Sequence, residues 1–386
     1  MHPTKHAIGG AALVATLLFS THAAAIKIFS NGPYVVPETI SLVPAGFGSF
    51  SGSYFIPDAV TNNIWVMPST GGAPSLFGTP VSTDSNNRID GGAFLPSGWG
   101  GGNSAQYVVT AQTLVAYDSN GTQRTFSSAS GALTTPLLAP AGFATYGNDL
   151  FVSDQNDLIW RISHIDGTAT QFNSQIAVRA DGTFFTPFGL EFTPTDFGSF
   201  GDKLLVSDGV NSTDIYGKRT SQILALSTAG TPTPFATVLL KDDPAGGPGQ
   251  SGLRQMVMAP DDYFLDVLGI PGQLLLVSVS GQGSGMGGGV LGDILAFDQY
   301  GNEVASLRDA LGLTKFDPRG MFFAADGNLL ISDTSPADPI WAATARDFQL
   351  APAAVPVPGT LALVALGLAS LVFVRSDFSR RACAGR

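Results

Sequence analysis

Cysteine is almost missing from this chain. Its 386 residues include a single cysteine, Cys383, close to the C-terminal end. A body without a second cysteine cannot form a disulfide, and it has no thiolate for catalysis or for binding a metal. Thiol chemistry is therefore excluded for all of the chain before residue 383.

Histidine is nearly as scarce. Three of the four histidines lie within the first 25 residues, which leaves His164 alone in the rest of the chain. The usual zinc sites and two-histidine iron sites need more than one histidine, and a Ser-His-Asp triad could use only His164. The surrounding pattern, Trp160 to Gly167, is that of a strand running into a turn, so we expect a structural histidine there.

Basic residues and glutamate are also few. Residues 26–355 hold 14 Lys or Arg against 29 Asp or Glu, a formal balance of −15. A polyanion would be repelled, and no basic stripe with aromatic residues is present, so nucleic acid is excluded as a partner. Only three of the acids are glutamate. Aspartate suits turns, where it bonds its own backbone, and the composition predicts an all-β body of strands and loops.

The first 25 residues have the pattern of a secretory signal peptide. Lys5 gives a weakly basic start, an apolar stretch runs from Ala7 to Phe19, and Ala23 and Ala25 are the small residues of a cleavage site. The sequence therefore predicts a signal helix over 1–25 that is removed on export.

The C-terminal end predicts a second targeting segment. Residues 351–360 form a Pro-rich linker, in which Pro356 and Pro358 block helix formation. An apolar helix over 361–374 would be about 21 Å long, which is shorter than the roughly twenty residues that span a membrane. The basic tail, 375–386, would stay on the cytoplasmic side and leave the body outside.

The order of this end resembles the PEP-CTERM sorting segment of exported Gram-negative bacterial proteins. The residues that carry the resemblance are Val355, Pro356, Val357, Pro358, Gly359 and Thr360, with Val357 where the family has glutamate. The resemblance implies an exosortase-like sorting protease as a partner, a membrane-tethered or cell-surface location, and a link with exopolysaccharide.

A repeat occupies the body. A short strand of three apolar residues, then Ser, Thr or Pro and one further residue, occurs six times, at Tyr54–Asp58, Tyr107–Ala111, Leu150–Asp154, Leu204–Asp208, Leu275–Val279 and Leu329–Asp333. Each copy is followed by a second short apolar strand. Short strands that repeat every 45 to 70 residues are typical of a β-propeller.

A segment that combines glycine with an apolar residue, usually phenylalanine, precedes each copy, and it predicts the strand that lines the central channel. These segments are Gly46-Phe47, Gly92-Ala93-Phe94, Gly142-Phe143, Phe188-Gly189-Leu190, Gly252-Leu253 and Gly320-Met321-Phe322. Glycine would permit close packing at the narrow inner end of a blade, and phenylalanine would fill the space between blades.

The repeat resembles the six-bladed propellers of the NHL and SMP-30/gluconolactonase type, with residues 316–333 as the best match. The resemblance covers roughly residues 44–348, and we expect the propeller domain to occupy residues 26–350. Its ring could be closed by an outer strand from Lys27–Pro44 or completed locally by Arg346–Leu350, and a seventh blade built from Lys27–Pro44 is the remaining alternative.

Four of the six repeated strands end in an acid, and these are the candidate binding residues: Asp58, Asp154, Asp208 and Asp333. Each could cap a turn by accepting backbone N–H groups. They could instead form a ring of carboxylates that holds Ca²⁺ or a sugar at the channel mouth. Two sets offer oxygen ligands for calcium, namely Asp154, Asn156 and Asp157, and Asp208, Asn211 and Asp214.

Three long loops share one face of the predicted propeller, and binding sites are often built on such loops. They are Gly209–Thr220, Lys241–Ser251 and Gly281–Gly292. The last is rich in glycine but too irregular for a phosphate-binding fingerprint.

Two functions follow from these patterns. The first is an exported, surface-associated propeller of binding or scaffold type, with a polysaccharide or a surface protein as partner and no enzyme activity. The alternative is a metal-dependent lactonase or hydrolase, because the resemblance to SMP-30-like enzymes implies Glu and Asn metal ligands on inner strands. The predicted inner segments present Phe, Gly and Leu, with Glu191 as the only acid close to one, so we assign no catalytic residue.

Overall fold

The computed structural model describes residues 26–81, 88–173, 184–210, 218–242, 249–281, 291–307, 316–334 and 339–351, and the backbone of 212–213. The predicted signal peptide, sorting motif, apolar C-terminal helix and basic tail all lie outside these residues. Within them, no helix has the length and apolar character that a membrane crossing requires.

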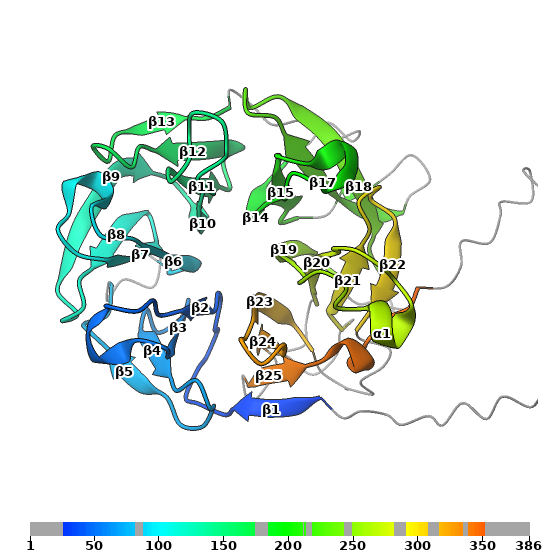
Figure 1. Cartoon of the computed structure of the whole chain (residues 1–386), viewed down its shortest axis with the longest axis horizontal. Coiled ribbons are helices and arrows are strands. Elements are labelled where there is room, and N and C mark those ends of the chain that lie inside the picture. The colour runs from blue at the N-terminus through cyan, green and yellow to red at the C-terminus, as the bar shows by residue number, and fades with distance from the viewer. Residues whose placement is uncertain are drawn as a thin grey trace, which may run out of the picture.

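Six antiparallel sheets stand around a central axis like the blades of a propeller (Figure 1). The prediction of six blades is confirmed, and a seventh blade built from Lys27–Pro44 is wrong. The innermost strands are β2 (Ser41–Leu42), β6 (Gly91–Leu95), β10 (Leu133–Leu138), β14 (Pro187–Phe192), β19 (Gly252–Met258) and β23 (Pro318–Phe323).

The next two positions in each blade form its middle. The second strands are β3 (Tyr54–Pro57), β7 (Gln106–Thr110), β11 (Leu150–Asp154), β15 (Leu204–Asp208), β20 (Leu275–Ser280) and β24 (Leu329–Asp333). The third strands are β4 (Ile64–Met67), β8 (Thr113–Tyr117), β12 (Leu158–Ile162), β17 (Arg219–Leu226), β21 (Asp293–Phe297) and β25 (Ile340–Ala343). All six repeated strands are therefore confirmed, within one or two residues at their ends.

The outer strands are β5 (Ser75–Phe77), β9 (Gln123–Ser130), β13 (Ala169–Gln171), β18 (Pro232–Leu239), β22 (Glu303–Ser306) and β1 (Lys27–Ser30). A short β16 (Ser212–Thr213) also pairs with β17. The helical segments are single turns: η1 (Gly48–Phe50), η2 (Trp99–Gly101), η3 (Gly198–Phe200), α1 (Leu265–Leu268) and η5 (Ala345–Asp347).

The ring is closed by the N-terminal strand. β1 pairs antiparallel with β25, so that Lys27 lies opposite Ala342 and completes the last blade. The alternative closure by Arg346–Leu350 is wrong, because β26 (Gln349–Leu350) pairs with β22 and extends the fifth blade instead. The two ends of the propeller therefore lie on the outer edges of neighbouring blades.

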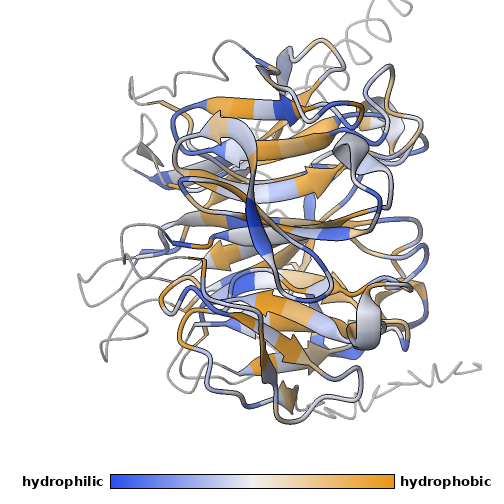
Figure 2. Ribbon diagram, turned by 90° about the vertical axis from the view of Figure 1, so that its left-hand side faces the viewer, coloured by the Kyte–Doolittle hydropathy of each residue, from blue (hydrophilic) through white to orange (hydrophobic). Residues whose placement is uncertain are grey.

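The second strands are buried along their whole length, because each blade is covered on both faces. Leu204–Asp208, for example, has no exposed position, which is the pattern expected for a strand in the middle of stacked layers. Six apolar clusters fill the spaces between successive blades. In the side view of Figure 2 the strands carry most of the apolar colour.

Two of the six predicted inner segments lie elsewhere. Gly46-Phe47 and Gly142-Phe143 belong to the turns that follow β2 and β10, where each Phe N–H donates to the carbonyl of a proline three residues earlier. Both phenylalanines are buried between blades, so the expected packing role is kept although the position is wrong. The other four segments lie in β6, β14, β19 and β23, as predicted.

The Ser or Thr of the repeated strand ties each blade to the next. In five blades its hydroxyl group donates a hydrogen bond to a backbone carbonyl of the following blade, in the innermost strand or just before it. The donors are Thr110, Ser153, Ser207, Ser278 and Ser332, and the four serine bonds are 2.5 to 2.8 Å long. The first blade has Pro57 at this position, and there Ser41 makes the contact, donating to the carbonyl of Gly92 at 2.9 Å. A buried hydroxyl with a partner on the next blade fixes both the register and the spacing of the ring.

Candidate functional site at the central channel

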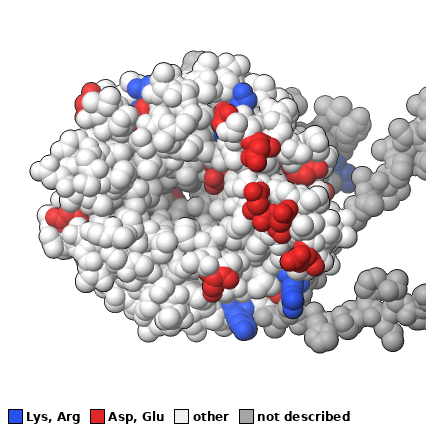
Figure 3. Space-filling model, viewed as in Figure 1, with Lys and Arg blue, Asp and Glu red and all other residues white. Residues whose placement is uncertain are grey.

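The channel has two different mouths. All six innermost strands begin at one end, which we call the loop-side mouth because the connections between blades arrive there. The innermost strands end at the opposite end of the channel, where a hairpin turn connects each of them to the second strand of its blade. We call this end the hairpin-side mouth. Figures 1 and 3 look onto the hairpin side, and the space-filling surface is hollowed at the axis (Figure 3).

Six charged side chains gather at the loop-side mouth. Each lies in the lead-in to an innermost strand or among the first residues of that strand, and we call them the loop-side cluster: Glu38, Arg88, Asp90, Arg254, Asp317 and Arg319. The prediction that Glu191 is the only acid near an inner segment is therefore wrong. Three acids lie within three residues of an innermost strand at this mouth, and Glu191 lies near the far end of β14.

The ion pairs of Arg88 in this cluster are longer than the ion pair of Arg319. Arg88 Nη2 lies 3.7 Å from Glu38 Oε1 and 3.6 Å from Asp90 Oδ1, which is beyond direct hydrogen bonding. Arg319 Nη2 lies 3.1 Å from Asp317 Oδ2. The Arg88 side chain is 50% exposed, whereas that of Glu38 is 4% exposed. Arg88 is thus more exposed to solvent than Arg319, whose side chain is 17% exposed, and Glu38 is buried beside Arg88.

Glu38 is a buried acid whose charge is only partly compensated. Burial raises the pKa of Glu38 to about 7, against the opposing effect of nearby guanidinium groups, first among them Arg319. Its Oε1 atom is buried and accepts no hydrogen bond from any residue that the structure describes. Burial also raises the pKa of Asp90. Glu38 and Asp90 therefore resist ionisation beside the charged Arg254 and Arg319, which makes the mouth attractive to an anion.

Two arginines of the cluster have unused donors. The Nε–H groups of Arg254 and Arg319 are buried and have no hydrogen-bond partner in the described part of the chain. Arg254 is held over the Phe188 ring, with its guanidinium carbon 4.5 Å from the ring centroid. Burial lowers the pKa of Arg254 to about 10, so it stays protonated at neutral pH. Buried donors without partners are rare in native proteins and call for a ligand or a water molecule.

Asp317 has a structural part in the cluster. Its Oδ1 atom accepts from the Ser280 hydroxyl at 2.8 Å and from the Gly281 N–H at 2.9 Å. Its Oδ2 atom accepts from Thr334 and from Arg319. With both oxygens in use, Asp317 holds Arg319 in place and links the fifth blade to the sixth.

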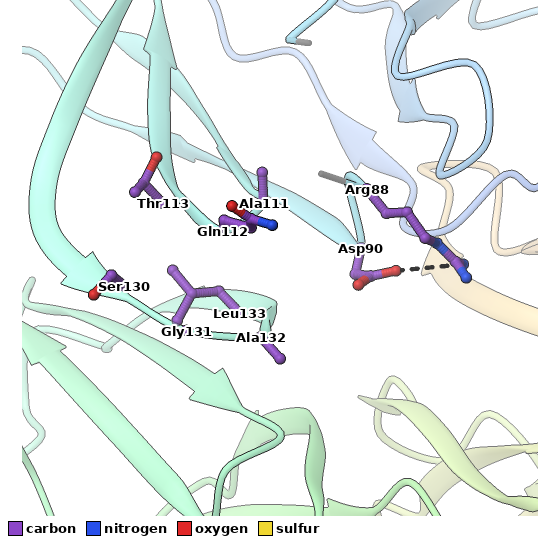
Figure 4. Close-up of a pocket in the computed structure, with 9 residues that line it drawn as sticks. All are labelled: Arg88, Asp90, Ala111, Gln112, Thr113, Ser130, Gly131, Ala132 and Leu133. Atoms are coloured by element: carbon purple, nitrogen blue, oxygen red, sulfur yellow. Dashed lines mark ion pairs between the residues drawn. The ribbon is translucent and has the colours of Figure 1, made fainter. Parts of the chain in front are cut away.

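A cavity of about 530 Å³ adjoins this cluster (Figure 4). It is bounded by Arg88, Asp90, Gln112, Thr113, Ser130 and the segment Gly131–Leu133 of the second and third blades, together with Ala111. The close-up shows Arg88 passing Asp90, to which it is joined by the ion pair. A volume of this size suits a small molecule.

The four predicted aspartates each accept hydrogen bonds from nearby N–H groups at turns. Asp58 accepts from the backbone N–H groups of Val35, Val36, Val60 and Thr61. Asp154 accepts from the N–H of Ala132 and of Asn156.

Asp208 and Asp333 follow the same pattern. Asp208 accepts from Thr186 and Val210, and Asp333 accepts from the N–H of Asp317 and the indole of Trp341. All four carboxylates are at most 1% exposed. This geometry favours the turn interpretation, in which each aspartate fastens the lead-in of an innermost strand to the second strand.

The residues around these aspartates suit a metal ion poorly. Asn156 directs its amide Nδ2 at Asp154 Oδ1, 2.8 Å away, so a donor occupies the place of a ligand oxygen. Asn211 and Asp214 of the second calcium set lie outside the described residues. Within those residues, no three His, Cys, Asp or Glu side chains are grouped as a metal site requires. At the loop-side cluster, three arginines would repel a divalent cation.

His164 is held by a neighbouring acid. Its Nδ1 atom lies 2.6 Å from Asp149 Oδ1, and its backbone N–H donates to the same oxygen at 2.9 Å. Arg161 pairs with the other oxygen of Asp149 at 3.2 Å. The expectation of a structural histidine agrees with these contacts. The three long loops predicted for binding lie only in part within the described residues, which include 218–220, 241–242, 249–251 and 291–292.

No protein-family model matches this sequence, and no curated protein matches it significantly. Several solved structures are similar in overall chain path. A putative gluconolactonase is 14% identical with a TM-score of 0.49, covering 84% of this chain and 92% of that one. Regucalcin, a calcium-binding protein of Agrobacterium tumefaciens, is 13% identical with a TM-score of 0.49, covering 82% and 92%. Virginiamycin B lyase of Staphylococcus aureus is 15% identical with a TM-score of 0.44, covering 80% of each chain.

Proposed function

We propose that the loop-side mouth is the active site of a hydrolase that acts on a small, carboxylate-bearing ester or lactone without a metal ion. The observation that carries the proposal is the grouping of a buried, partly protonated Glu38 with two arginines whose Nε–H donors have no partner among the described residues. The proposal agrees with the hydrolase alternative in placing a small-molecule site on the propeller, and it differs from that alternative in using no metal ion. The names of the similar solved structures agree with that alternative better than with a scaffold.

Recognition of an anion follows from the arginines. Arg254 and Arg319 present buried donors, and a carboxylate can accept two parallel hydrogen bonds from a guanidinium group. Arg88 lies at the cavity wall and is held only by weak ion pairs of 3.6 and 3.7 Å. An arriving carboxylate would draw Arg88 away from Glu38, which would open Glu38 to the cavity.

Glu38 supplies the acid–base chemistry. A carboxyl group whose pKa lies near 7 is suited both to accept and to return a proton at neutral pH. In its ionised form Glu38 takes a proton from the attacking water, and the arginines stabilise the negative charge that develops on the carbonyl oxygen. The same proton then passes to the departing alkoxide as the C–O bond breaks, which regenerates the carboxylate.

The test is turnover of a panel of carboxylate-bearing and neutral lactones and esters by the purified protein, with a metal chelator present throughout. We expect turnover of the acidic compounds, a loss of about 100-fold or more in Glu38→Gln, and a raised KM in Arg254→Gln. Glu303→Gln is the matched control, because it makes the same change on the outer strand β22. Saturable binding without turnover would contradict the hydrolase and leave a binding role. Absence of both would reject the site.

We also propose that the chain is exported and tethered by its C-terminal segment, with an exosortase-like protease and surface polysaccharide as its partners. This rests on residues 1–25 and 351–386 of the sequence. Mass spectrometry of the surface form is the test. An intact Arg386 would show that the tail is not cut, and a mass that begins at Met1 would contradict cleavage after Ala25.

A further inference from the structure

The hairpin-side mouth contains a second cavity with a different chemistry. About 370 Å³ in volume, it lies where β10, β14 and β19 end, and it therefore faces away from the loop-side cluster. Six of its nine lining residues are apolar: Leu137, Leu138, Pro140, Phe192, Pro194 and Met258. Three polar residues, Glu191, Thr193 and Gln273, complete the wall.

One residue of the polar wall, Gln273, carries an acceptor without a donor among the described residues. Gln273 Oε1 is buried and has no hydrogen-bond partner in the part of the chain that the structure describes. Thr193 cannot supply one, because its hydroxyl donates to the carbonyl of Phe200. A buried carbonyl oxygen that has lost water costs free energy until a donor reaches it.

The charge of the wall is low. Burial raises the pKa of Glu191 to about 8, so its carboxyl is largely protonated at pH 7. None of the nine lining residues is Lys, Arg or His. An anion would find no cation there, and a cation would find an acid that is largely protonated at neutral pH, so either would lose its hydration with little compensation.

We propose that this hairpin-side cavity binds an uncharged, largely apolar small molecule that carries one hydroxyl or amide N–H, which donates to Gln273 Oε1. The apolar body would lie against Leu138, Phe192 and Met258. The neutral Glu191 carboxyl would offer a second hydrogen bond to the same polar group. This site is separate from the proposed active site, and the two proposals can fail independently.

The probes are three molecules with one shared body: 2-naphthalenemethanol, 2-methylnaphthalene and 2-naphthoate. They are titrated into the purified full chain at pH 7 and followed by naphthyl fluorescence. We expect the alcohol to bind most tightly, the methyl compound about tenfold more weakly because the hydrogen bond is lost, and the carboxylate more weakly than the alcohol. Absence of saturable binding by the alcohol would overturn the proposal.

Variants assign the effect to the cavity. Gln273→Leu should reduce the alcohol-to-methyl preference to about twofold or less, and Gln273→Met is a second change that also removes the acceptor. Gln349→Leu, at an exposed position of β26, should leave the preference unchanged. Glu38→Gln should leave it unchanged as well, which separates this site from the loop-side mouth. A tenfold preference that survives in both Gln273 variants would refute the assignment.

Discussion

The hydroxyl of Ser332 donates a 2.6 Å hydrogen bond to the backbone carbonyl of Glu38, across 294 positions of sequence. This bond joins the sixth blade to the lead-in of the first, so it spans the seam at which the ring closes. It also fixes the backbone of the residue that we place at the centre of the candidate active site. Closure of the fold and alignment of the site therefore depend on the same contact.

Replacing Ser332 by alanine should lower the free energy of unfolding by about 1–2 kcal/mol, because the buried Glu38 carbonyl would lose its donor. Ser278→Ala should cost a similar amount, since it breaks the equivalent contact to Arg319. Ser51→Ala, at an exposed position, should cost less than about 0.5 kcal/mol. Denaturant unfolding measures all three, and equal values for Ser332→Ala and Ser51→Ala would argue against a structural role for the seam bond.

Gly320→Ala should be more damaging than the serine change. A Cβ atom at Gly320 would lie only 1.9 Å from the Glu38 carbonyl oxygen, so the two blades would have to move apart. We expect a loss of about 2 kcal/mol or more. Gly142→Ala is the matched control, because nothing lies within 4 Å of its added Cβ. Melting temperatures of the two variants should differ by several degrees, and a Gly320→Ala protein as stable as Gly142→Ala would contradict the close approach.

Stability should fall as pH rises through the window set by Glu191. The pKa of Glu191 is raised from an ordinary value of 4.5 to about 8, so the folded state holds this proton when the unfolded state has lost it. The contribution is fully present below about pH 4.5 and is lost by about pH 8. Relative to the native protein, Glu191→Gln should gain about 1–2 kcal/mol between pH 5 and pH 9. A difference in unfolding free energy that does not change with pH would show that Glu191 titrates normally.

Calcium should not stabilise the propeller through the four predicted aspartates. Their carboxylates already accept hydrogen bonds from backbone and indole N–H groups, as Asp58 does from Val35, Val60 and Thr61. A cation would have to displace these bonds. Addition of about 1 mM Ca²⁺, the range of weak calcium modules, or of a chelator should leave the melting temperature unchanged. A calcium-dependent rise that disappears in Asp154→Asn would restore the ligand interpretation.

The middle strands of the blades could be predicted because their chemistry repeats. Leu204–Asp208 and Leu329–Asp333 are buried on both faces, so each reads as an uninterrupted apolar run that ends in a polar turn. The inner strand Ser41–Leu42 could not be found in this way, since it is two residues long and carries no glycine. The neighbouring Gly46-Phe47 has the expected composition but forms the turn.

The loop-side cluster could not be predicted from the sequence for a different reason. Glu38, Asp90 and Asp317 are far apart in the sequence, and only the ring brings them to one place. Two of these acids share a weak sequence pattern that could have indicated the site. In Ile89-Asp90 and Phe316-Asp317 the acid directly follows a buried apolar residue and precedes an innermost strand. Arg254 and Arg319 gave none, because a single arginine in a strand is most often a surface residue.

The pairing of Lys27 with Ala342 also sets an order of events during synthesis. The strand that closes the ring leaves the ribosome first, and its partner is made last. Until β25 arrives, β1 has no neighbour to bond, and an unpaired strand of this kind can associate with other chains. Native pairing must then close a loop that contains almost the whole protein, and such long-range contacts fold slowly. A chain that stops before β25 would therefore be unable to form a shorter propeller and would be prone to aggregate.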